Sequence, residues 1–586
     1  SVWRSEGMTK KKVELSLWIA WILMVGICYY VFLPPLNIHN PGSWMFIMIV
    51  VILPVAAILL LTSFNASATK IKLKDISKPK GVRKVAFYLI FFCMIAFVLM
   101  IVLQIYSGKM FHAKRYASML EIKDKNITED LDEADAVSKI ALMDSNSARI
   151  LGDRKMGSLT EVVSQFSVDN YYSQIDLEGV PVKVAALHYD NFLKFIGNYK
   201  NGVPGYIKVD PVGQKAEYVK LKEGMKFVPG SYFNKKLERH LRFSYPTVIM
   251  ENIHFEVDEK GNPFYIASVV DYKIGLFGGK TIKGAIVCDP VTGDSIYYKL
   301  KDIPRWVDGV FDGDLLVEQY NWYGLLNNGY FNSILGKKGC KKCTETIAQA
   351  KNADGELVPM ADYGYISKDG DIWIYTGVTS VNDDASNIGF IMVNQRTQEA
   401  HAFSVAGADE NSAMAAAEGE VQEKGYKASF PSLINVDGTA TYVMVLKDAS
   451  GIVKLYSMVN VEQYNLVTTS SNLDDCFAKY RLLINGKVSK EDLDKEEPKD
   501  DDTDSSDPNT GMTDNRTFEE KTIQVASISY IAVGGDTWIY ITDPQNIIYK
   551  QKVADNEQVI LIRVNDVIKA DCALSKDQIY DMKYKK

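Results

Sequence analysis

The spacing of hydrophobic residues divides the chain into two unlike parts. Three apolar runs lie in the first part, at residues 13–33, 43–63 and 85–106. Each is close to the roughly 20 residues that a helix needs to cross the hydrocarbon of a bilayer. The second part contains short stretches in which apolar and polar residues alternate, as in half-buried strands. The pattern predicts a membrane-anchored α+β protein with three N-terminal transmembrane helices, the second of which can kink at Pro54.

Lysine and arginine near the apolar runs predict how the anchor is oriented. The first loop, 34–42, contains neither residue, whereas the second loop is strongly basic. The basic residues of the second loop are Lys70, Lys72, Lys74, Lys78, Lys80, Arg83 and Lys84. Because lysine and arginine accumulate on the cytoplasmic side, we expect this loop and the N-terminus inside the cell and everything after residue 106 outside. The seven side chains also suit anionic lipid head groups, but a topology signal is the simpler interpretation.

Four segments of the second part share the order strand, polar turn, strand: 202–221, 283–300, 387–405 and 439–459. The first two turn at Asp-Pro followed by glycine, which presets one φ angle and supplies a residue that tolerates positive φ. An alanine-rich helix is expected after the third, with Asp409 as its N-cap and Gly425 as its end. Repeated hairpins preceded by helices resemble the PepSY type of extracytoplasmic module. The resemblance implies a fold and no particular activity.

The composition changes abruptly at 490–515, which contains eleven acidic residues, three lysines and almost no apolar ones. Such a segment cannot bury a core, so we expect a disordered insertion. About five short strands follow Thr517, and their spacing predicts a small C-terminal β-barrel of the OB kind. The expected organisation is a cytoplasmic tail (1–12), a three-helix transmembrane anchor (13–107), an extracytoplasmic α+β region (108–488), the acidic insertion (489–516) and the barrel (517–586).

Charge and motifs argue against several classes of function. The formal net charge of −7 disfavours a nucleic-acid partner. The six histidines lack an H-E-x-x-H motif and zinc-helix spacing. The segment "GLFGGKT" at 275–281 misses the phosphate-loop spacing by one residue. We therefore expect no metal and no cofactor.

Acidic and aromatic residues alternate in the segment 303–333. The candidate ligand-binding residues there are Trp306, Asp308, Asp312, Asp314, Trp322 and Tyr323. Carboxylates beside aromatic rings suit sugar binding, or even a glycosidase pair, whose separation the sequence does not give. The alternative is that the tryptophans and tyrosines cap a hydrophobic core. No catalytic residue is assigned by this pattern.

Two cysteines sit three residues apart in "GKKGCKKCTET", at Cys340 and Cys343. Outside the cell such a pair is most simply a local disulfide that closes a loop tip. The lysines around the pair would lower a thiol pKa and so suit redox chemistry, whereas a zinc site would need a second pair of ligands nearby. The disulfide is the preferred interpretation.

Several phrases, among them "LGDRKMG", "GVPGYIKVDPV", "IGLFGGK", "IPRWVDGV" and "SAMAAAEGEVQ", are similar to those of a family of large membrane proteins of Gram-positive bacteria. The resemblance covers residues 120–475 and the C-terminal barrel. It implies an architecture and no established activity. The acidic insertion and the cysteine pair are local features that the family pattern does not require.

These observations predict a cell-membrane protein with a cytoplasmic N-terminus and an extracellular ectodomain. We expect the ectodomain to bind partners or to assemble into homo-oligomers at the cell surface. The expected partners are the lipid bilayer, further copies of the chain, and other envelope proteins or glycan. The alternative is an envelope enzyme that acts on glycan through the Trp306–Tyr330 segment or on thiols through Cys340 and Cys343.

Overall fold

The computed structural model describes residues 2–63, 81–131, 142, 145–211, 215–344, 347–351, 357–361, 363–381, 386–449, 451, 453–486 and, with short gaps, 519–585. The chain forms two compact units, Ser1–Glu497 and Pro498–Lys586. The boundary between them falls within the predicted acidic insertion. That insertion, together with Lys70, Lys72, Lys74, Lys78 and Lys80, lies outside the described residues.

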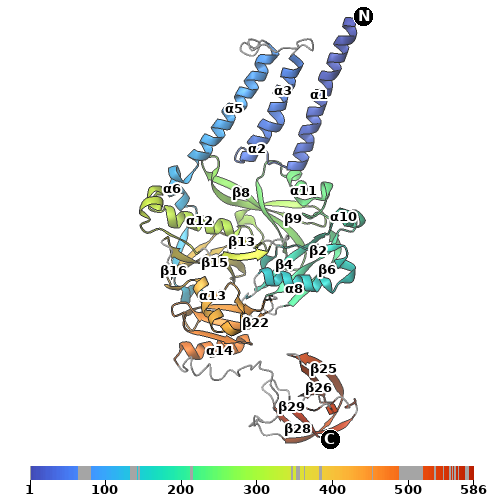
Figure 1. The fold of residues 1–586 in the computed structure, drawn as a ribbon, viewed down its shortest axis with the longest axis vertical. Coiled ribbons are helices and arrows are strands. Elements are labelled where there is room, and N and C mark those ends of the chain that lie inside the picture. Colours follow the sequence, from blue (N-terminus) through green and yellow to red (C-terminus); the bar gives the residue numbers. More distant parts are fainter. Residues whose placement is uncertain are drawn as a thin grey trace. The chain divides into compact units, whose positions relative to one another are not determined.

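The N-terminal part of the first unit consists of long apolar helices, drawn in blue in Figure 1. They are α1 (Val2–Phe32), a second helix built from α2 (Pro41–Phe46), η1 (Ile47–Ile52) and α3 (Leu53–Ser63), and α5 (Val82–Tyr106). Lys12–Phe32, Pro41–Thr62 and Val82–Tyr106 are each long and apolar enough to cross a membrane. The three predicted apolar helices are therefore confirmed.

A wider helical turn accommodates Pro54 in the second helix. Proline has no N–H, and its ring crowds the carbonyl four residues back. The preceding segment, Ile47–Ile52, is a π-helix, and the Leu53 N–H bonds to the carbonyl of Met48, five residues back. Such single π-turns relieve a local conflict in an otherwise regular helix. The irregularity that Pro54 predicts in this helix thus lies in the π-helical turn before the proline.

The remainder of the first unit, called the globular region (109–486), is rich in sheet. Its strands are β1 (Ile122–Lys125), β2 (Phe166–Val168), β3 (Ser173–Leu177), β4 (Val180–Tyr189), β5 (Val203–Asp210), β6 (Lys215–Met225), β7 (Met250–Val257), β8 (Pro263–Ile274), β9 (Gly278–Cys288), β10 (Ser295–Lys299), β11 (Lys341–Cys343), β12 (Ile347–Lys351), β13 (Leu357–Ala361), β14 (Gly364–Lys368), β15 (Asp371–Ser380), β16 (Ser386–Asn394), β17 (Ala400–Phe403), β18 (Gly407–Ala408), β19 (Lys427–Ala428), β20 (Ser432–Val436), β21 (Thr439–Lys447), β22 (Val453–Asn460) and β23 (Val467–Ser470). Within the described residues they form four larger sheets and the β12–β13 hairpin.

The four sheets are named by their strands. The β2–β6 sheet has the order β2-β4-β5-β6 with β3 on β4, and the β7–β10 sheet has the order β10-β9-β8-β7. The β14–β18 sheet has the order β1-β17-β16-β15-β11, with β14 on β15 and β18 on β16. The β19–β23 sheet has the order β19-β21-β22-β23, with β20 on β21. Pairing is antiparallel except between β1 and β17.

Short helices cover these sheets and separate them. They are α6 (Lys109–Ala117), α7 (Ile127–Asp130), α8 (Ser145–Gly157), α9 (Thr160–Val163), α10 (Phe192–Asn198), η3 (Phe233–Lys235), α11 (Leu237–Ser244), η4 (Leu300–Asp302), α12 (Gly313–Leu326), η5 (Asn332–Gly336), α13 (Glu410–Gly419), η6 (Gln422–Lys424) and α14 (Leu473–Ile484). α12 shares one hydrophobic core with the β7–β10 and β14–β18 sheets, α13 shares a second with the β14–β18 and β19–β23 sheets, and α14 packs on the β19–β23 sheet.

The β7–β10 sheet is buried on both faces, and β8 shows why. Tyr265 and Ala267 belong to the core shared with the β2–β6 sheet, whereas Ile266 and Val270 belong to the core shared with α12. Successive side chains of a strand point to opposite faces, so a strand between two cores is almost continuously buried. Ser268 is the polar exception on the α12 side, where its hydroxyl donates to the carbonyl of Val310 at 2.7 Å.

Several local predictions are confirmed. The four predicted hairpins correspond to β5–β6, β9–β10, β16–β17 and β21–β22. Asp409 is the N-cap of α13 and accepts from the Ser412 N–H at 2.7 Å, although α13 ends at Gly419 and a 3₁₀ turn fills the interval to Gly425.

A glycine-rich turn joins the globular region to the anchor. The tip of the β8–β9 hairpin reaches the end of α5, where the Leu276 N–H donates to Ser107 Oγ at 3.0 Å. Gly275 has a φ of 59°, and a Cβ on Gly278 would lie 2.3 Å from the carbonyl oxygen of Ser107. Only glycine accepts such a conformation and approach at no cost. The segment that misses the phosphate-loop spacing is therefore a docking turn.

The second unit is an all-β fold with its own core. Its strands are β24 (Glu519–Gln524), β25 (Ser527–Val533), β26 (Asp536–Thr542), β27 (Ile548–Lys552), β28 (Val567–Leu574) and β29 (Tyr580–Lys585). They form one sheet of order β24-β28-β29-β27-β26-β25 around a core that includes Ile523, Ile541 and Ile568. In the described residues β24 and β25 are the two edges and do not pair. The expected β-rich unit is present, but the predicted closed barrel is not observed.

Candidate functional site

A pocket of about 330 Å³ opens between the β7–β10 sheet and α12. Its lining residues are Glu251, Asn252, Ser268, Lys280, Ile282, Asp312, Asp314, Leu315 and Glu318. Four of these side chains are carboxylates and one is a lysine, so negative charge is in excess. Small-molecule sites in proteins are concave, and placed polar groups orient the ligand in them.

A β-bulge shapes the strand side of the pocket. The register of β7 and β8 shifts between Glu251 and Ile253, and Asn252 takes a φ of 47°. Positive φ is uncommon for any residue with a side chain, but asparagine tolerates it better than most. Bulges commonly re-aim side chains beside functional sites. Here the bulge places Glu251 and Asn252 at the pocket, and the carbonyl of Asn252 turns inward to bond His254 Nδ1 at 2.9 Å.

The first turns of α12 form the other side. Asp312 is the N-cap residue, and Gly313 follows because a Cβ there would lie 2.2 Å from the ring of Tyr363. Asp314 and Glu318 are four residues apart and therefore share one face of the helix. Acidic residues are favourable at a helix N-terminus, where the backbone dipole is positive. The helix thus presents three carboxylates to the pocket at a modest cost in free energy.

The surroundings raise the pKa values of two of these carboxylates, Asp312 and Asp314. Burial raises the pKa of Asp312, and the neighbouring Asp314 raises it further. Burial also raises the pKa of Asp314, against a hydrogen bond from Tyr363 that lowers it. Lys280 is paired with Glu251; burial lowers the lysine pKa, but the pair outweighs burial and leaves the pKa raised. Asp312 and Asp314 form no ion pair within the described residues.

A fully buried cluster lies behind the pocket; we call His254, Glu256 and Asp308 the His254 cluster. His254 Nε2 lies 2.8 Å from Glu256 Oε1. Glu256 also accepts the backbone N–H groups of Asp308 at 3.0 Å and Gly309 at 2.7 Å. A Cβ on residue 309 would lie 2.5 Å from His254 Nε2, so glycine is required there. The phrase "WVDGV" of the sequence thus has a packing explanation.

The surroundings of the His254 cluster shift the pKa values of two of its members. Burial lowers the pKa of His254, but its bond to Glu256 more than compensates and leaves the pKa raised. Burial, and then the charge of Glu256, hold the pKa of Asp308 well above its usual range. Asp308 Oδ2 accepts from the Asp176 N–H at 2.7 Å, whereas Oδ1 is buried without a hydrogen-bond partner in the described structure. A neutral Asp308 fits this environment.

The structure divides the acidic and aromatic candidates into three groups. Asp312 and Asp314 line the pocket, and Asp308 is buried in the His254 cluster. The aromatic side chains pack elsewhere: Trp306 on Phe264, Trp322 edge-on against Tyr116, and Tyr323 against Tyr320. No aromatic residue is among those that line the pocket. The stacking platform that would suit a sugar is therefore not assembled with the carboxylates in the described region.

Five pocket residues lie outside the segment that the sequence singled out. Glu251, Asn252, Ser268, Lys280 and Ile282 come from three different strands, between 30 and 61 residues before Asp312. The available signal was weak, because Glu251 and Asn252 begin a strand whose alternation is broken by the bulge. Cross-strand neighbours depend on register, which a sequence pattern does not supply across a bulge.

The cysteine pair is not bonded. Cys340 and Cys343 are both buried free thiols. The segment between them is the extended strand β11; three residues of strand span about 10 Å, which exceeds the roughly 7 Å between Cα atoms that a disulfide allows. The predicted disulfide is thus absent from this structure. Burial also raises the pKa of Cys343, so the expectation that nearby lysines would activate that thiol is wrong.

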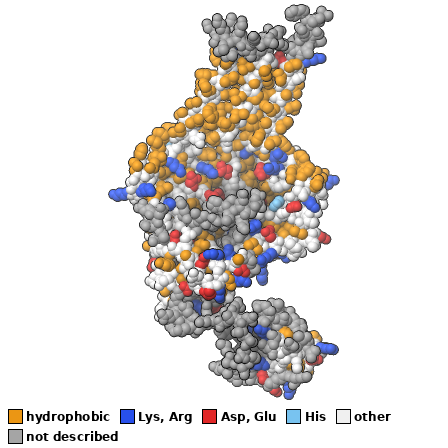
Figure 2. Space-filling model, viewed as in Figure 1, with side chains coloured by type: hydrophobic (Ala, Val, Ile, Leu, Met, Phe, Trp, Pro, Cys, Tyr) orange, Lys and Arg blue, Asp and Glu red, His pale blue; other side chains and the backbone are white. Residues whose placement is uncertain are grey.

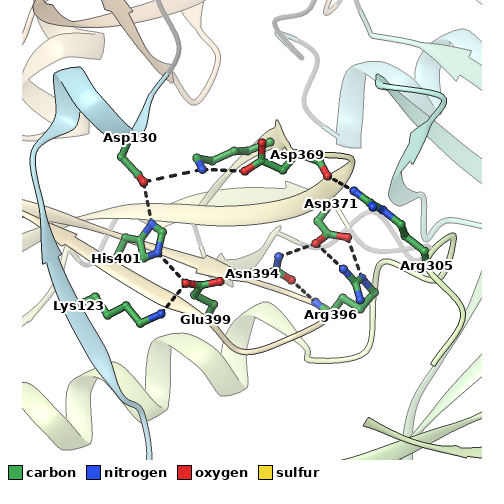
Figure 3. Close-up of polar contacts among 10 residues, drawn as sticks. Lys123, Asp130, Arg305, Asp369, Asp371, Asn394, Arg396, Glu399 and His401 are labelled. Atoms are coloured by element: carbon green, nitrogen blue, oxygen red, sulfur yellow. Dashed lines mark hydrogen bonds and ion pairs between the residues drawn. The ribbon is translucent and has the colours of Figure 1, made fainter. Parts of the chain in front are cut away.

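A second polar cluster lies on the β14–β18 sheet, and Figure 3 shows it. We call it the His401 network: Lys123, Asp130, Arg305, Lys368, Asp369, Asp371, Asn394, Arg396, Glu399 and His401. His401 lies 2.7 Å from Asp130 and 3.2 Å from Glu399, and Lys123 lies 2.7 Å from Glu399. Arg396 donates twice to Asp371, each time at 2.7 Å. The contacts of His401 and Lys123 hold β1 and α7 against β17, and those of Arg396 hold the turn after β16 against the start of β15.

Comparisons with known proteins do not identify the chain. No family model matches it, and no curated protein matches it. The resemblance to Gram-positive membrane proteins therefore stays a prediction, and the chemistry of the pocket carries the functional argument.

Proposed function

We propose that the chain is a membrane-anchored binding protein whose pocket takes a cationic organic group, an amine or a guanidinium, at the membrane surface. The observation that carries this proposal is the lining of the pocket, with four carboxylates against one lysine. Like charges held close together raise each other's pKa and cost free energy. A bound cation would relieve that cost, and this relief would contribute to its affinity.

The arrangement of the carboxylates favours an organic cation over a metal ion. Glu251 comes from β7, while Asp312, Asp314 and Glu318 are spread along two turns of α12. The described residues contain no group of three histidine, cysteine, aspartate or glutamate side chains placed to hold a metal ion. An ammonium or guanidinium donates several hydrogen bonds to separate acceptors, and such acceptors are what this pocket offers.

The position of the pocket favours a ligand near the bilayer. Glu318, at its rim, forms an ion pair of 3.8 Å with Lys109. Lys109 begins α6, three residues after α5 ends at Tyr106. The apolar span and the rim of the pocket are thus joined by one short segment. An amine-bearing lipid headgroup and the basic side chain of another envelope protein share the required chemistry.

A thermal-shift assay on the detergent-solubilised full chain tests the proposal, with spermidine and lysine methyl ester as probes. We expect both to raise the unfolding midpoint of the unsubstituted protein, and the Asp312→Asn/Asp314→Asn variant to lose this response. Glu217→Gln is a matched control, because Glu217 is an exposed carboxylate on β6 paired only with Lys208 at 3.2 Å in the described ion pairs. An equal response in all three proteins would overturn the proposal.

The proposal includes a topology in which the globular region faces outward as an extracellular ectodomain. The basic second loop supports this orientation through the positive-inside rule. Arg83 and Lys84, its described members, lie in the first turn of α5. Impermeant labelling of a cysteine placed at Lys74 in intact cells would contradict it.

We further propose that the ectodomain assembles into homo-oligomers, with other envelope proteins or glycan as further partners. The hairpin β5–β6, which follows α10, supports a PepSY-like unit. The six-stranded second unit supports an OB-like module that forms part of the assembly. Native mass spectrometry of the full chain in detergent tests this idea, since a monomer at every concentration would argue against it.

A further inference from the structure

The globular region carries an exposed apolar surface on α10 and the turn that precedes α11. We call it the α10 ledge: Phe192, Leu193, Ile196, Tyr199, Tyr232 and Phe233. Leu193 is 76% exposed and Phe233 is 59% exposed. Figure 2 shows hydrophobic side chains at the position that Figure 1 gives to α10, in addition to those that cover the long helices. Large contiguous apolar patches on a protein surface mark interaction sites.

The α10 ledge is continuous with the end of the first apolar span. The ring of Phe192 lies 6.0 Å from that of Phe233 and 4.9 Å from that of Tyr232. Tyr30, two residues before the C-terminal end of α1, donates a hydrogen bond from its hydroxyl to Asn234 Oδ1 at 3.2 Å. Phe233 of the ledge is therefore the direct neighbour in sequence of Asn234, whose side chain contacts the span.

Arg239 fixes the turn between the ledge and the span. Its Nε donates to the carbonyl of Tyr30 at 3.0 Å, its guanidinium lies 3.8 Å from the centre of the Tyr30 ring, and its Nη1 donates to the carbonyl of Phe233. Phe233 has a φ of 52°. A bulky residue with positive φ is a real outlier, and such strain persists where the surroundings impose it. Here the strained backbone holds an aromatic ring out from the protein.

The two segments that form the α10 ledge carry only positively charged side chains. Residues 192–200 and 232–236 contain no aspartate or glutamate. They contain four lysines: Lys194, Lys200, Lys235 and Lys236. Aromatic and aliphatic side chains beside lysines are the composition of surfaces that lie in the interfacial layer of a membrane. Lysines there add attraction to anionic lipid head groups.

We propose that the α10 ledge rests in the interfacial layer of the bilayer, with its lysines at the head groups and Leu193 and Phe233 at the upper acyl chains. The bilayer is favoured over a second copy of the chain because the ledge continues directly from a membrane-spanning helix, and because its lysines complement anionic lipid. The ledge would then fix the tilt of the globular region relative to the membrane and hold the pocket close to the surface.

The probe is a bimane fluorophore on a single introduced cysteine, in the full chain reconstituted into nanodiscs. Leu193→Cys and Phe233→Cys report on the ledge, and Tyr464→Cys is the matched control, since Tyr464 is an aromatic residue, 56% exposed, that follows β22. Cys28→Ser removes the half-buried native thiol, and the other native cysteines are buried. Acyl chains brominated near the head group serve as quenchers, in neutral and in anionic discs.

We expect brominated lipid to quench most of the emission at positions 193 and 233 and to leave position 464 unchanged. Anionic lipid should deepen the quenching, and Lys235→Gln/Lys236→Gln should remove that increase without changing quenching in neutral discs. Quenching of the ledge positions by aqueous iodide instead of by lipid would overturn the proposal. Protection from both quenchers, with crosslinking between two labelled chains, would overturn it in favour of a second copy.

Discussion

Two clusters of carboxylates in the globular region contrast in charge balance. The His401 network gathers four carboxylates, and beside them stand two lysines, two arginines and a histidine. The pocket gathers four carboxylates with one lysine in its lining. Both clusters bring together residues far apart in the chain. The first is neutralised by its own side chains. In the second, Lys280 pairs with Glu251 and Lys109 with Glu318, whereas Asp312 and Asp314 form no ion pair in the described residues.

This difference distinguishes a cluster that stabilises the fold from a binding site. In the His401 network, Asp371 is held by two bonds from Arg396 and one from Asn394, and Asp130 and Glu399 hold His401 between them. A cluster satisfied in this way rigidifies the fold. In the pocket, Asp312 and Asp314 have raised pKa values and face a cavity. Perturbed carboxylates in a cavity are more typical of function than of support.

The largest expected effect comes from breaking the balanced cluster. Asp371→Ala should lower the free energy of unfolding by about 3 kcal/mol, because Arg396 keeps its partial burial and loses its carboxylate. Thermal or denaturant unfolding of the detergent-solubilised chain measures this change. Asp314→Asn is the control, since it removes a carboxylate that forms no ion pair in the described residues. Equal effects of the two substitutions would remove the contrast between the clusters.

Glu410 sharpens the comparison, because it is a buried carboxylate that forms no ion pair with any described residue. Burial raises its pKa to about 6, although the Gly377 N–H donates to it at 2.5 Å. Its ordinary pKa is 4.5, so the folded state binds more protons than the unfolded state between these two values. Stability should therefore fall as the pH rises through this window and stay lower above it.

Glu410→Gln tests this pH dependence. The amide stays neutral at every pH, so the variant should show a smaller fall in unfolding midpoint between pH 4.5 and 6 than the unsubstituted chain. Glu217→Gln, on the exposed face of β6, is the control and should keep the fall. Parallel midpoint curves for the unsubstituted chain and the Glu410 variant would contradict this assignment.

The smallest expected effect is a gain in stability at the pocket. Asp312→Asn removes a half-buried charge beside Asp314, and we expect it to raise the free energy of unfolding by about 0.5 kcal/mol. Stability–function trade-offs at binding sites have this sign. A clear loss of stability would mean that Asp312 supports α12, for example by capping it, although its side chain makes no capping hydrogen bond.

Features with a strong local cause could be predicted from the sequence. The three spans follow from length and apolarity, and the N-cap at Asp409 follows from a side chain that bonds its own backbone three residues on. The four hairpins follow from turn chemistry.

Half of the candidate site could be predicted and half could not. Asp312 and Asp314 were marked by their own segment, whereas Glu251 and Lys280 reach the pocket only through the register of β7, β8 and β9. The aromatic neighbours suggest a ligand platform that the fold does not build, because Trp322 packs on Tyr116. Alternation along a chain tells which residues are apolar, but not which core receives them.

The most direct test of the central claim is isothermal titration of spermidine into three forms of the full chain. They are the unsubstituted protein, Asp312→Asn/Asp314→Asn and Glu399→Gln, the last removing a carboxylate from the His401 network. We predict saturable binding that weakens with added salt, a loss of about tenfold or more in affinity for the pocket variant, equivalent to about 1.4 kcal/mol, and no change for Glu399→Gln. Equal affinity in all three, or no binding to any, would contradict the assignment of the pocket as a cation site.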